Sequence, residues 1–349
     1  MDMKQTRIIS LVLVATFALL PTVAGAYDFM ADGIYYDLVD GHAVVTNSGQ
    51  AGCYSGNIVI PATVTNDSTT FPVTTIGHSA FKNCTELTTA VLPGSITAIE
   101  PRVFEGCTSL TSMVVPNSVT TMGANVFDKC YAIDSIVIGN SVPSLGDYTF
   151  NDCRALKKVV IGKSVASIGK YAFHGCQSLT EVTLPNPVTT IGDWAFWNCS
   201  QLRSVTIGTD ITSIGQTVFD GCHQIMSVTC LAATPPIVIY GGLFDDSGMY
   251  YHAKLHVLPE AVEAYETAEI WNLFFQIIGD AKIPVPEDVN GDSEVNVADA
   301  NSVVVIIING GSGGHTRPDG KPIDADVNGD GEVNIADVNA IINAILNNQ

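Results

Sequence analysis

The segment "LTSMVVPNSVTTMGANVFDKC", residues 110–130, recurs in altered form along much of the chain. The copies follow one another at a constant interval, which is the separation of Phe81 and Phe104. When the copies are aligned, three columns keep their residue type: a Phe, a Cys three positions later, and a Leu or Ile six positions after the Phe. Seven units in register at three independent columns predict a tandem-repeat architecture. The columns are Phe81, Phe104, Phe127, Phe150, Phe173, Phe196 and Phe219; Cys84, Cys107, Cys130, Cys153, Cys176, Cys199 and Cys222; and Leu87, Leu110, Ile133, Leu156, Leu179, Leu202 and Ile225.

One unit shows how the repeat should fold. "LTEVTLP" (179–185) alternates apolar and polar residues, which predicts a short strand with one buried face. "VTTIG" (188–192) predicts a second extended piece, ended by a Gly that can take a positive φ. "DWAFWNC" (193–199) then predicts a tight helical turn with its Phe and Cys pointing inward. Because one unit cannot bury its own apolar face, stability must come from stacked neighbours, so we expect a solenoid.

These units resemble the BspA-type leucine-rich repeats of bacterial surface proteins, with seven units over residues 71–230. The opening "YDFMADGIYYDLV" is similar to the leading segment of that family, which implies an N-terminal cap over 27–70. "CLAATPPIVI" and "LHVLPEAVEAYETAEIWNLFFQII" resemble its closing segment, which implies a C-terminal cap over 231–281. The resemblance implies a mainly β solenoid in secreted or surface proteins, with binding or adhesion as the usual role and no catalytic residues.

The chain has nine cysteines, seven of them in the repeat column, with Cys53 and Cys230 near its two ends. Parallel side chains on stacked turns point the same way rather than toward each other, which disfavours disulfides between neighbours. We therefore expect buried free thiols that act as small hydrophobic side chains.

Residues 1–26 are typical of an export signal, with Lys4 and Arg7 before the apolar run "IISLVLVATFALL" and a small-residue cleavage pattern at its end. No lipid-anchor Cys follows the expected cut, and the apolar run is short for a membrane span. The formal charge of −20 disfavours nucleic acid and anionic membranes as partners. We expect a secreted or cell-surface protein without membrane insertion.

Two similar twelve-residue strings, "DVNGDSEVNVAD" (288–299) and "DVNGDGEVNIAD" (326–337), place oxygen-bearing residues where a calcium loop needs them. Positions 1, 3, 5, 9 and 12 carry Asp or Asn, and position 7, which supplies a backbone carbonyl, is Glu in both copies. We expect two Ca²⁺ ions that clamp the structure, with a regulatory calcium signal as the alternative. The predicted ligands are Asp288, Asn290, Asp292, Glu294, Asn296 and Asp299 in the first loop, and Asp326, Asn328, Asp330, Glu332, Asn334 and Asp337 in the second.

Asp at the last loop position, one helix after each loop and the duplication together resemble a type I dockerin module over 288–349, joined by the linker "KIPVPE" (282–287). The resemblance implies a small all-α, calcium-binding domain whose partner is a cohesin-type protein. In that family, loop positions 10 and 11 set partner choice. Here they are apolar, where cellulosomal dockerins carry Ser/Thr pairs: Val297, Ala298, Ile335 and Ala336.

No catalytic motif stands out: the seven His residues share no repeat column, and no nucleophile elbow, zinc motif or phosphate loop is present. The polar positions of the main sheet, from Thr88 to Ser227, predict a solvated face. Two residues before each Phe, however, Tyr148, Tyr171 and Trp194 should stack as a strip, with Trp197 close by. Such a strip either binds sugar rings or peptides or serves mutual packing.

Taken together, the sequence predicts an exported, non-catalytic recognition or adhesion protein. Its solenoid would bind an unidentified protein or glycan, and its calcium-folded tail would attach it to a cohesin-type partner. The alternatives are a structural spacer without a ligand of its own, and a component, catalytic or not, of a polysaccharide-degrading complex. The tail could also clasp the chain's own solenoid.

Overall fold

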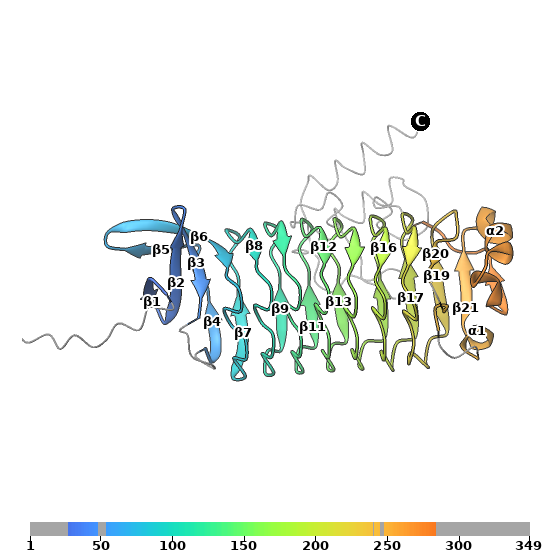
Figure 1. Cartoon of the computed structure of the whole chain (residues 1–349), viewed down its shortest axis with the longest axis horizontal. Helices are drawn as coiled ribbons and strands as arrows, with labels where there is room; N and C mark the ends of the chain where they lie inside the picture. Colours follow the sequence, from blue (N-terminus) through green and yellow to red (C-terminus); the bar gives the residue numbers. More distant parts are fainter. Residues whose placement is uncertain (1–26, 48–53, 240, 245–247, 284–349) are drawn as a thin grey trace, which may run out of the picture.

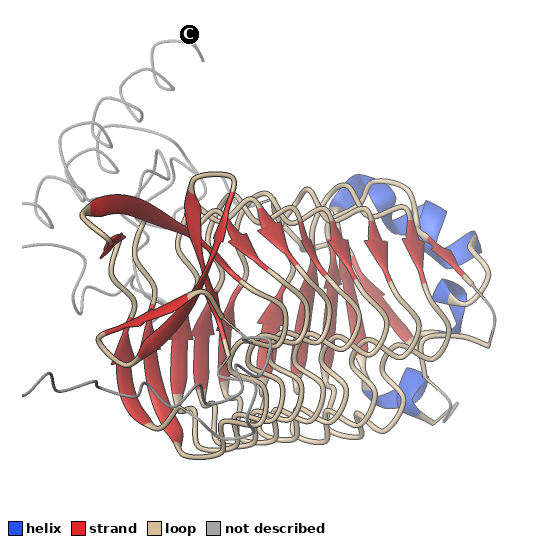
Figure 2. Ribbon diagram, turned by 60° about the vertical axis from the view of Figure 1, so that its left-hand side comes forward, coloured by secondary structure: helices blue, strands red, loops and turns tan. Residues whose placement is uncertain are grey.

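The computed structural model describes residues 27–47, 54–239, 241–244 and 248–283. These residues form one elongated solenoid in which each repeat unit makes one turn (Figure 1). Each turn contributes two short strands to two rows that run along the molecule, joined by loops (Figure 2). The predicted mainly β solenoid of stacked repeats is confirmed. None of the helices in the described ranges is both long enough and apolar enough to cross a membrane.

Within each row, strands that pair with each other are parallel and come from successive turns. Ser135, for example, lies opposite Ser112 on one side and Lys158 on the other. The first row comprises β4 (Gly56–Val59), β7 (Leu87–Val91), β9 (Ser112–Val114), β11 (Ser135–Val137), β13 (Lys158–Val160), β15 (Glu181–Thr183), β17 (Ser204–Ile207), β19 (Ser227–Cys230), β21 (Lys254–Val257) and β22 (Gln276–Ile278). The second comprises β6 (Thr69–Ile76), β8 (Ala98–Ile99), β10 (Thr121–Met122), β12 (Ser144–Leu145), β14 (Ser167–Ile168), β16 (Thr190–Ile191), β18 (Ser213–Ile214) and β20 (Ile237–Val238).

The two ends differ from the repeats. At the N-terminal end, β1 (Phe29–Ala31), β2 (Ile34–Val39) and β3 (His42–Thr46) form an antiparallel meander whose last strand pairs in parallel with β6, and β5 (Thr63–Asn66) pairs antiparallel with β6. The helices of the described residues gather at the other end (Figure 1). They are α1 (Met249–His252), η1 (Pro259–Ala261), α2 (Val262–Thr267) and η2 (Trp271–Leu273).

The core is a ladder of fully buried Phe side chains. Neighbouring rings from Phe81 to Phe219 stack at centroid distances of 4.9–5.6 Å. Tyr54 and Phe244 extend the ladder at its two ends, at 4.7 and 6.0 Å from their neighbours. Burial of each ring stabilises the fold by about 1.5–3 kcal/mol before conformational entropy is subtracted.

The cysteines of the column are buried, and those from Cys107 to Cys222 are free thiols, as predicted. From Cys107 onward, each column thiol lies 3.0–3.2 Å from the carbonyl oxygen of the Phe one turn earlier, with Cys153 donating to Phe127. Burial raises the pKa of the Cys153 thiol well above its ordinary value. These thiols are therefore protonated hydrogen-bond donors inside the core, a use of Cys that its hydrophobic character alone does not reveal.

The glycine that ends the second strand serves a different purpose from the one predicted. Gly192 does not have a positive φ. A Cβ added to it would lie 2.6 Å from the backbone nitrogen of Lys170, and the same crowding occurs at Gly169 and Gly215. The column is glycine because the backbone of the preceding turn passes too close for a side chain.

Candidate binding surface on the turn side of the solenoid

The stretch that carries the Phe and Cys of each unit, called here the turn side, has an unusual backbone. The residue two positions before each Phe has a positive φ in all seven units, between 44° and 62°. Glycine, Asn and Asp adopt this left-handed conformation most easily, whereas bulky side chains are rare there. The positions are Ser79, Arg102, Asn125, Tyr148, Tyr171, Trp194 and Thr217.

Three consecutive members of this column are aromatic and form the predicted stack. Tyr148 and Tyr171 have ring centroids 5.0 Å apart with an interplanar angle of 9°, and Tyr171 and Trp194 are 5.1 Å apart at 17°. Trp197 joins from the neighbouring column, 6.3 Å from Tyr171. Tyr148 is 38% exposed and Trp197 is 37% exposed. We call these four residues the aromatic ridge.

The left-handed conformation is a cost that all seven units share, whatever residue they carry. A non-glycine residue there costs about 1–2 kcal/mol relative to glycine. In the middle units the two stacked pairs return about 1–3 kcal/mol beyond the area that they bury. The turn therefore sets the strain, and what distinguishes the middle units is a row of aromatic side chains in which Tyr148 and Trp197 are exposed.

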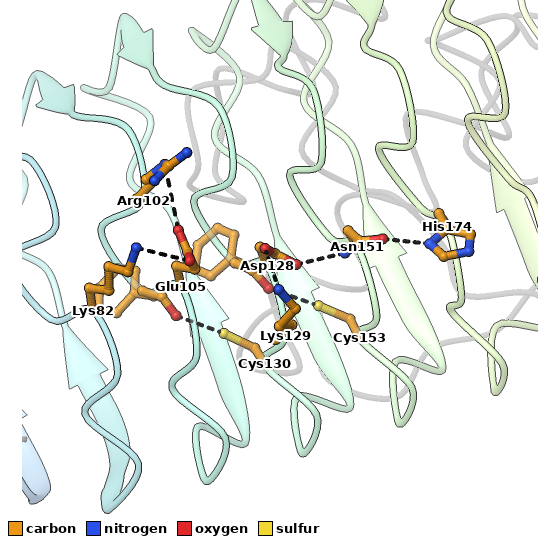
Figure 3. A network of polar contacts seen from close by, with 11 residues as sticks. Lys82, Arg102, Glu105, Asp128, Lys129, Cys130, Asn151, Cys153 and His174 are labelled. Atoms are coloured by element: carbon orange, nitrogen blue, oxygen red, sulfur yellow. Dashed lines mark hydrogen bonds and ion pairs between the residues drawn. The ribbon is translucent and has the colours of Figure 1, made fainter.

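Three polar residues that each follow a Phe form a ladder (Figure 3), and its last member, His174, lies 5.9 Å from Tyr171 of the ridge. Asn151 Nδ2 donates to Asp128 Oδ1 at 2.7 Å, and the ring nitrogen Nδ1 of His174 lies 2.5 Å from Asn151 Oδ1. Asp128 and Asn151 are buried, with exposures of 5% and 9%. Trp197 continues the column, with its ring 4.9 Å from that of His174. The ladder thus connects buried polar groups in the centre of the solenoid to the aromatic ridge.

His174 is neutral at physiological pH. Burial lowers the pKa of its imidazole, and the opposing attraction of Asp152 and Asp128 does not overcome this effect. Because the Asn151 amide nitrogen donates to Asp128, its oxygen is left to accept, so Nδ1 of His174 carries the proton. The imidazole is therefore held as one tautomer between Asn151 and the ridge.

At the other end of this column, charged residues replace the neutral ones. Lys82 Nζ lies 3.0 Å from Glu105 Oε1, and Arg102 Nε lies 3.6 Å from Glu105 Oε2 (Figure 3). The turn side therefore changes from an ion-pair cluster in the early units to an aromatic surface in the later ones.

The carboxylates around the ridge are not all neutralised. Lys170 pairs with Asp193 at 2.9 Å, which lowers the pKa of that carboxyl group. Asp147 is exposed and accepts the backbone N–H of Lys170 at 2.7 Å. Among the described residues, neither Asp147 nor Asp220 forms an ion pair. Near each end of the ridge there is therefore one carboxylate that forms no ion pair with a described residue, although the charge of Asp147 still acts on Lys170.

A second exposed surface was missed by the sequence reasoning. Besides the polar positions that were predicted to be solvated, the outward positions of the first strands in the first row carry valines that are 40–68% exposed. Alternation of buried and exposed residues within each strand could have revealed the row, which consists of Val59, Val91, Val114, Val137 and Val160.

The predicted calcium ligands, from Asp288 to Asp337, and the predicted partner-binding pairs Val297, Ala298, Ile335 and Ala336 lie outside the described residues. Within the described ranges, no group of three or more His, Cys, Asp or Glu side chains is arranged to hold a metal ion. The aromatic ridge is thus the one sequence-predicted site whose geometry the structure describes.

Both the repeat region and the C-terminal region of the chain match known protein families. The BspA-type leucine-rich repeat region matches in six copies over residues 56–157 and 143–244, and the dockerin type I domain matches over 286–346. No curated protein matches the chain.

Several solved structures are similar to the chain. A leucine-rich repeat protein of T. pallidum is 24% identical to this chain. The match covers 60% of this chain and 86% of that one, with a TM-score of 0.44. A leucine-rich cell surface protein of Faecalibacterium prausnitzii is 19% identical, covering 73% and 95%, with a TM-score of 0.43. A Bacteroides ovatus leucine-rich repeat protein is 19% identical, covering 67% and 77%, with a TM-score of 0.35.

Neither of the two matched families is a catalytic module. A leucine-rich solenoid joined to a dockerin domain is a combination suited to protein–protein interaction and complex assembly. The repeat match spans more than half of the sequence, so the chain belongs to the BspA-type leucine-rich repeat family and carries a type I dockerin domain at its C-terminal side.

Proposed function

We propose that this chain is an exported, non-catalytic recognition or adhesion protein. Its solenoid presents the binding surface, and its dockerin domain attaches it to a cohesin-type partner in a larger assembly. The observation that carries this proposal is the presence, in one chain, of a repeat solenoid and of two oxygen-rich loops within the dockerin match at 286–346.

The donor set of each loop fits calcium. Each contains three Asp and two Asn at the positions that supply side-chain oxygens, from Asp288 to Asp299 and from Asp326 to Asp337. Ca²⁺ takes six to eight oxygen ligands, which these side chains and the backbone carbonyls of Glu294 and Glu332 would provide. When bound, the ions would neutralise carboxylates that otherwise repel one another, so that the tail orders around them.

The apolar pairs at loop positions 10 and 11 support a particular kind of partner. Val297 with Ala298, and Ile335 with Ala336, offer no hydroxyl groups for hydrogen bonding. A partner surface that meets them should be apolar at its centre, since unpaired polar groups there would lose hydration without compensation. The proposed cohesin therefore differs in its contact residues from one that recognises Ser/Thr pairs.

Export also belongs to this proposal. The segment 1–26 has the composition of a signal peptide, and calcium at extracellular concentrations suits loops of this acidity. The buried, protonated cysteines give the solenoid no accessible thiol along its repeat column, which suits an oxidising environment.

The test uses the full chain and a purified type I cohesin domain, with calcium or with a chelator. We expect capture in calcium and none in chelator, and no capture by the double variant Asp288→Ala with Asp326→Ala. Calcium binding by calorimetry without any capture by a panel of cohesin domains would overturn the attachment proposal and favour contact of the tail with its own solenoid.

A further inference from the structure

The aromatic ridge ends abruptly on the side of the seventh unit. In the column of Trp194 the next residue is Thr217, and in the column of Trp197 the next is Asp220. Thr217 is too small to cover an indole ring, whereas the earlier ridge residues are covered on that side by another aromatic ring. The ridge therefore ends in what we call the step: the side chains of Trp194 and Trp197 have only Thr217 and Asp220 as the next residues in their columns.

Charge indicates what this step would accept. The segment 27–281 holds 23 acidic and 10 basic residues, a net charge of −13. The basic residue next to Tyr171 of the ridge, Lys170, already forms an ion pair with Asp193. Asp220 beside the step and Asp147 at the opposite end form no ion pair with another described residue. A cation is therefore the charged group that the ridge would favour.

The same solenoid contains a pairing of the required kind. Arg154 lies with its guanidinium carbon 4.9 Å from the centre of the Tyr131 ring, while its Nε is 3.2 Å from Asp152 Oδ1. A guanidinium can thus contact an aromatic face and a carboxylate together on this surface. Trp is the most favourable ring for such a cation–π contact.

We propose that the aromatic ridge binds an extended, basic segment of a partner protein. One arginine would lie against the indoles of Trp194 and Trp197 and pair with Asp220, and a second cation would pair with Asp147. This inference rests on the proposed function, since it identifies the ligand class of the solenoid's recognition surface.

The solenoid repeat sets the spacing of these two cations. Asp147 and Asp220 belong to units three turns apart, which separates them by about 15 Å along the solenoid axis at a stacking distance of about 4.8 Å per turn. An extended segment advances about 3.3 Å per residue, so its two basic residues should be about four or five positions apart. A helical segment rises only about 1.5 Å per residue, so its two basic residues would have to be about ten positions apart.

A neutral glycan fits the ridge less well. Sugar rings stack on the faces of aromatic side chains, but the faces between Tyr148, Tyr171 and Trp194 are turned toward one another at 5.0 and 5.1 Å. The free faces are at the ends, near the two carboxylates that form no ion pair with a described residue. Both features favour a cationic protein segment over a chain of uncharged rings.

The test measures binding of a synthetic peptide with two arginines four positions apart to the full chain, by calorimetry and by tryptophan fluorescence. We expect binding that weakens as salt is raised, because paired charges are screened. Trp197→Ala should lower the affinity about tenfold, and Asp147→Asn and Asp220→Asn about threefold each. Glu181→Gln on β15 and Tyr251→Ala on α1 remove one exposed acid and one exposed aromatic ring elsewhere, and should leave binding unchanged.

Three results would overturn the proposal. They are equal binding of a control peptide with glutamine in place of both arginines, binding of a neutral gluco-oligosaccharide but not of the peptide, and no binding of either. Thermal unfolding of each variant checks that the solenoid is folded. The Asp288→Ala with Asp326→Ala variant should bind the peptide as the wild type does, so failure of the ridge proposal and failure of the tail proposal remain distinguishable.

Discussion

Trp194 stacks on Tyr171 at a centroid distance of 5.1 Å, although both residues have a φ of 55°. The buried ladder beneath them contains the same kind of contact, since Phe173 and Phe196 stack at 4.9 Å with an angle of 3°. The two stacks differ in what they contribute. The inner one is fully buried and holds the turns together, whereas the outer one rests on a strained backbone at the surface.

Tyr171→Asn should therefore cost less stability than a change in the buried ladder. The variant loses two stacked pairs, worth about 1–3 kcal/mol beyond the area that they bury, and relieves part of a left-handed strain of about 1–2 kcal/mol, because Asn adopts this conformation more easily. We expect the free energy of unfolding in urea to fall by about 1–2 kcal/mol. Phe173→Ala is the control and should lose about 3–5 kcal/mol from a buried site. A loss at Tyr171 equal to that at Phe173 would show that the ridge is a packing element.

Gly192→Ala should destabilise the solenoid by about 1–3 kcal/mol, because the new methyl group would lie 2.6 Å from Lys170 N and 2.8 Å from Gly169 C. The turns would have to separate to admit it. Gly94→Ala is the matched control, since nothing lies within 4 Å of its added Cβ. Thermal unfolding of the two variants should separate them clearly, and equal melting temperatures would contradict the close-approach explanation.

The spacing of the sequence was sufficient to predict the core of the fold. Phe and Cys repeat at one constant interval, and both columns are buried in the structure. The same rule missed Tyr54 and Phe244, because the steps from Tyr54 to Phe81 and from Phe219 to Phe244 are both longer than the repeat interval. Ring stacking depends on position in space. Extra residues in the end loops shift Tyr54 and Phe244 out of the sequence interval, although both rings stack on the ladder in the structure.

The polar ladder was also invisible to a search for repeated residue types. Asp128, Asn151 and His174 occupy one column but differ in chemistry, and their relation appears only when each is paired with its neighbour one turn away. Likewise, nothing about Tyr148 or Trp194 as residues indicates a positive φ, since the conformation is imposed by the turn and not by the side chain. The aromatic stack itself was predicted correctly because it depends on the repeat spacing alone.

Cys153 should resist alkylation in the folded protein. Burial raises the pKa of its thiol well above the ordinary value, and its Sγ donates to Phe127 O at 3.1 Å, so almost no reactive thiolate is present at neutral pH. We expect peptide mapping by mass spectrometry to find no iodoacetamide adduct at this residue without denaturant, and complete modification in concentrated guanidinium. Rapid labelling of the native protein would contradict the protonated, buried state.

Removal of calcium should affect the tail and not the solenoid. We expect added calcium to raise the helical circular dichroism signal of the wild-type chain, and Asp288→Ala with Asp326→Ala to abolish that response, because each loop loses its first carboxylate ligand. Asp319→Ala removes an acid of the tail outside both loops and should respond as the wild type does. A double variant that still responds to calcium in full would show that the ligand assignment is wrong.

His174 should make the solenoid less stable in mild acid. Its folded-state pKa lies below the ordinary value of 6.5, so the unfolded chain binds more protons in this range and stability falls as the pH drops through about 6.5. His174→Gln keeps an amide donor toward Asn151 but cannot titrate. We therefore expect the melting temperature of the wild type to fall relative to this variant between about pH 7.5 and about pH 5. His223→Gln, at an exposed position, is the control for loss of a histidine and should follow the wild-type curve. Parallel curves for the wild type and His174→Gln would mean that the imidazole is charged without penalty, and the neutral hydrogen bond to Asn151 would then be the wrong description of this part of the ladder.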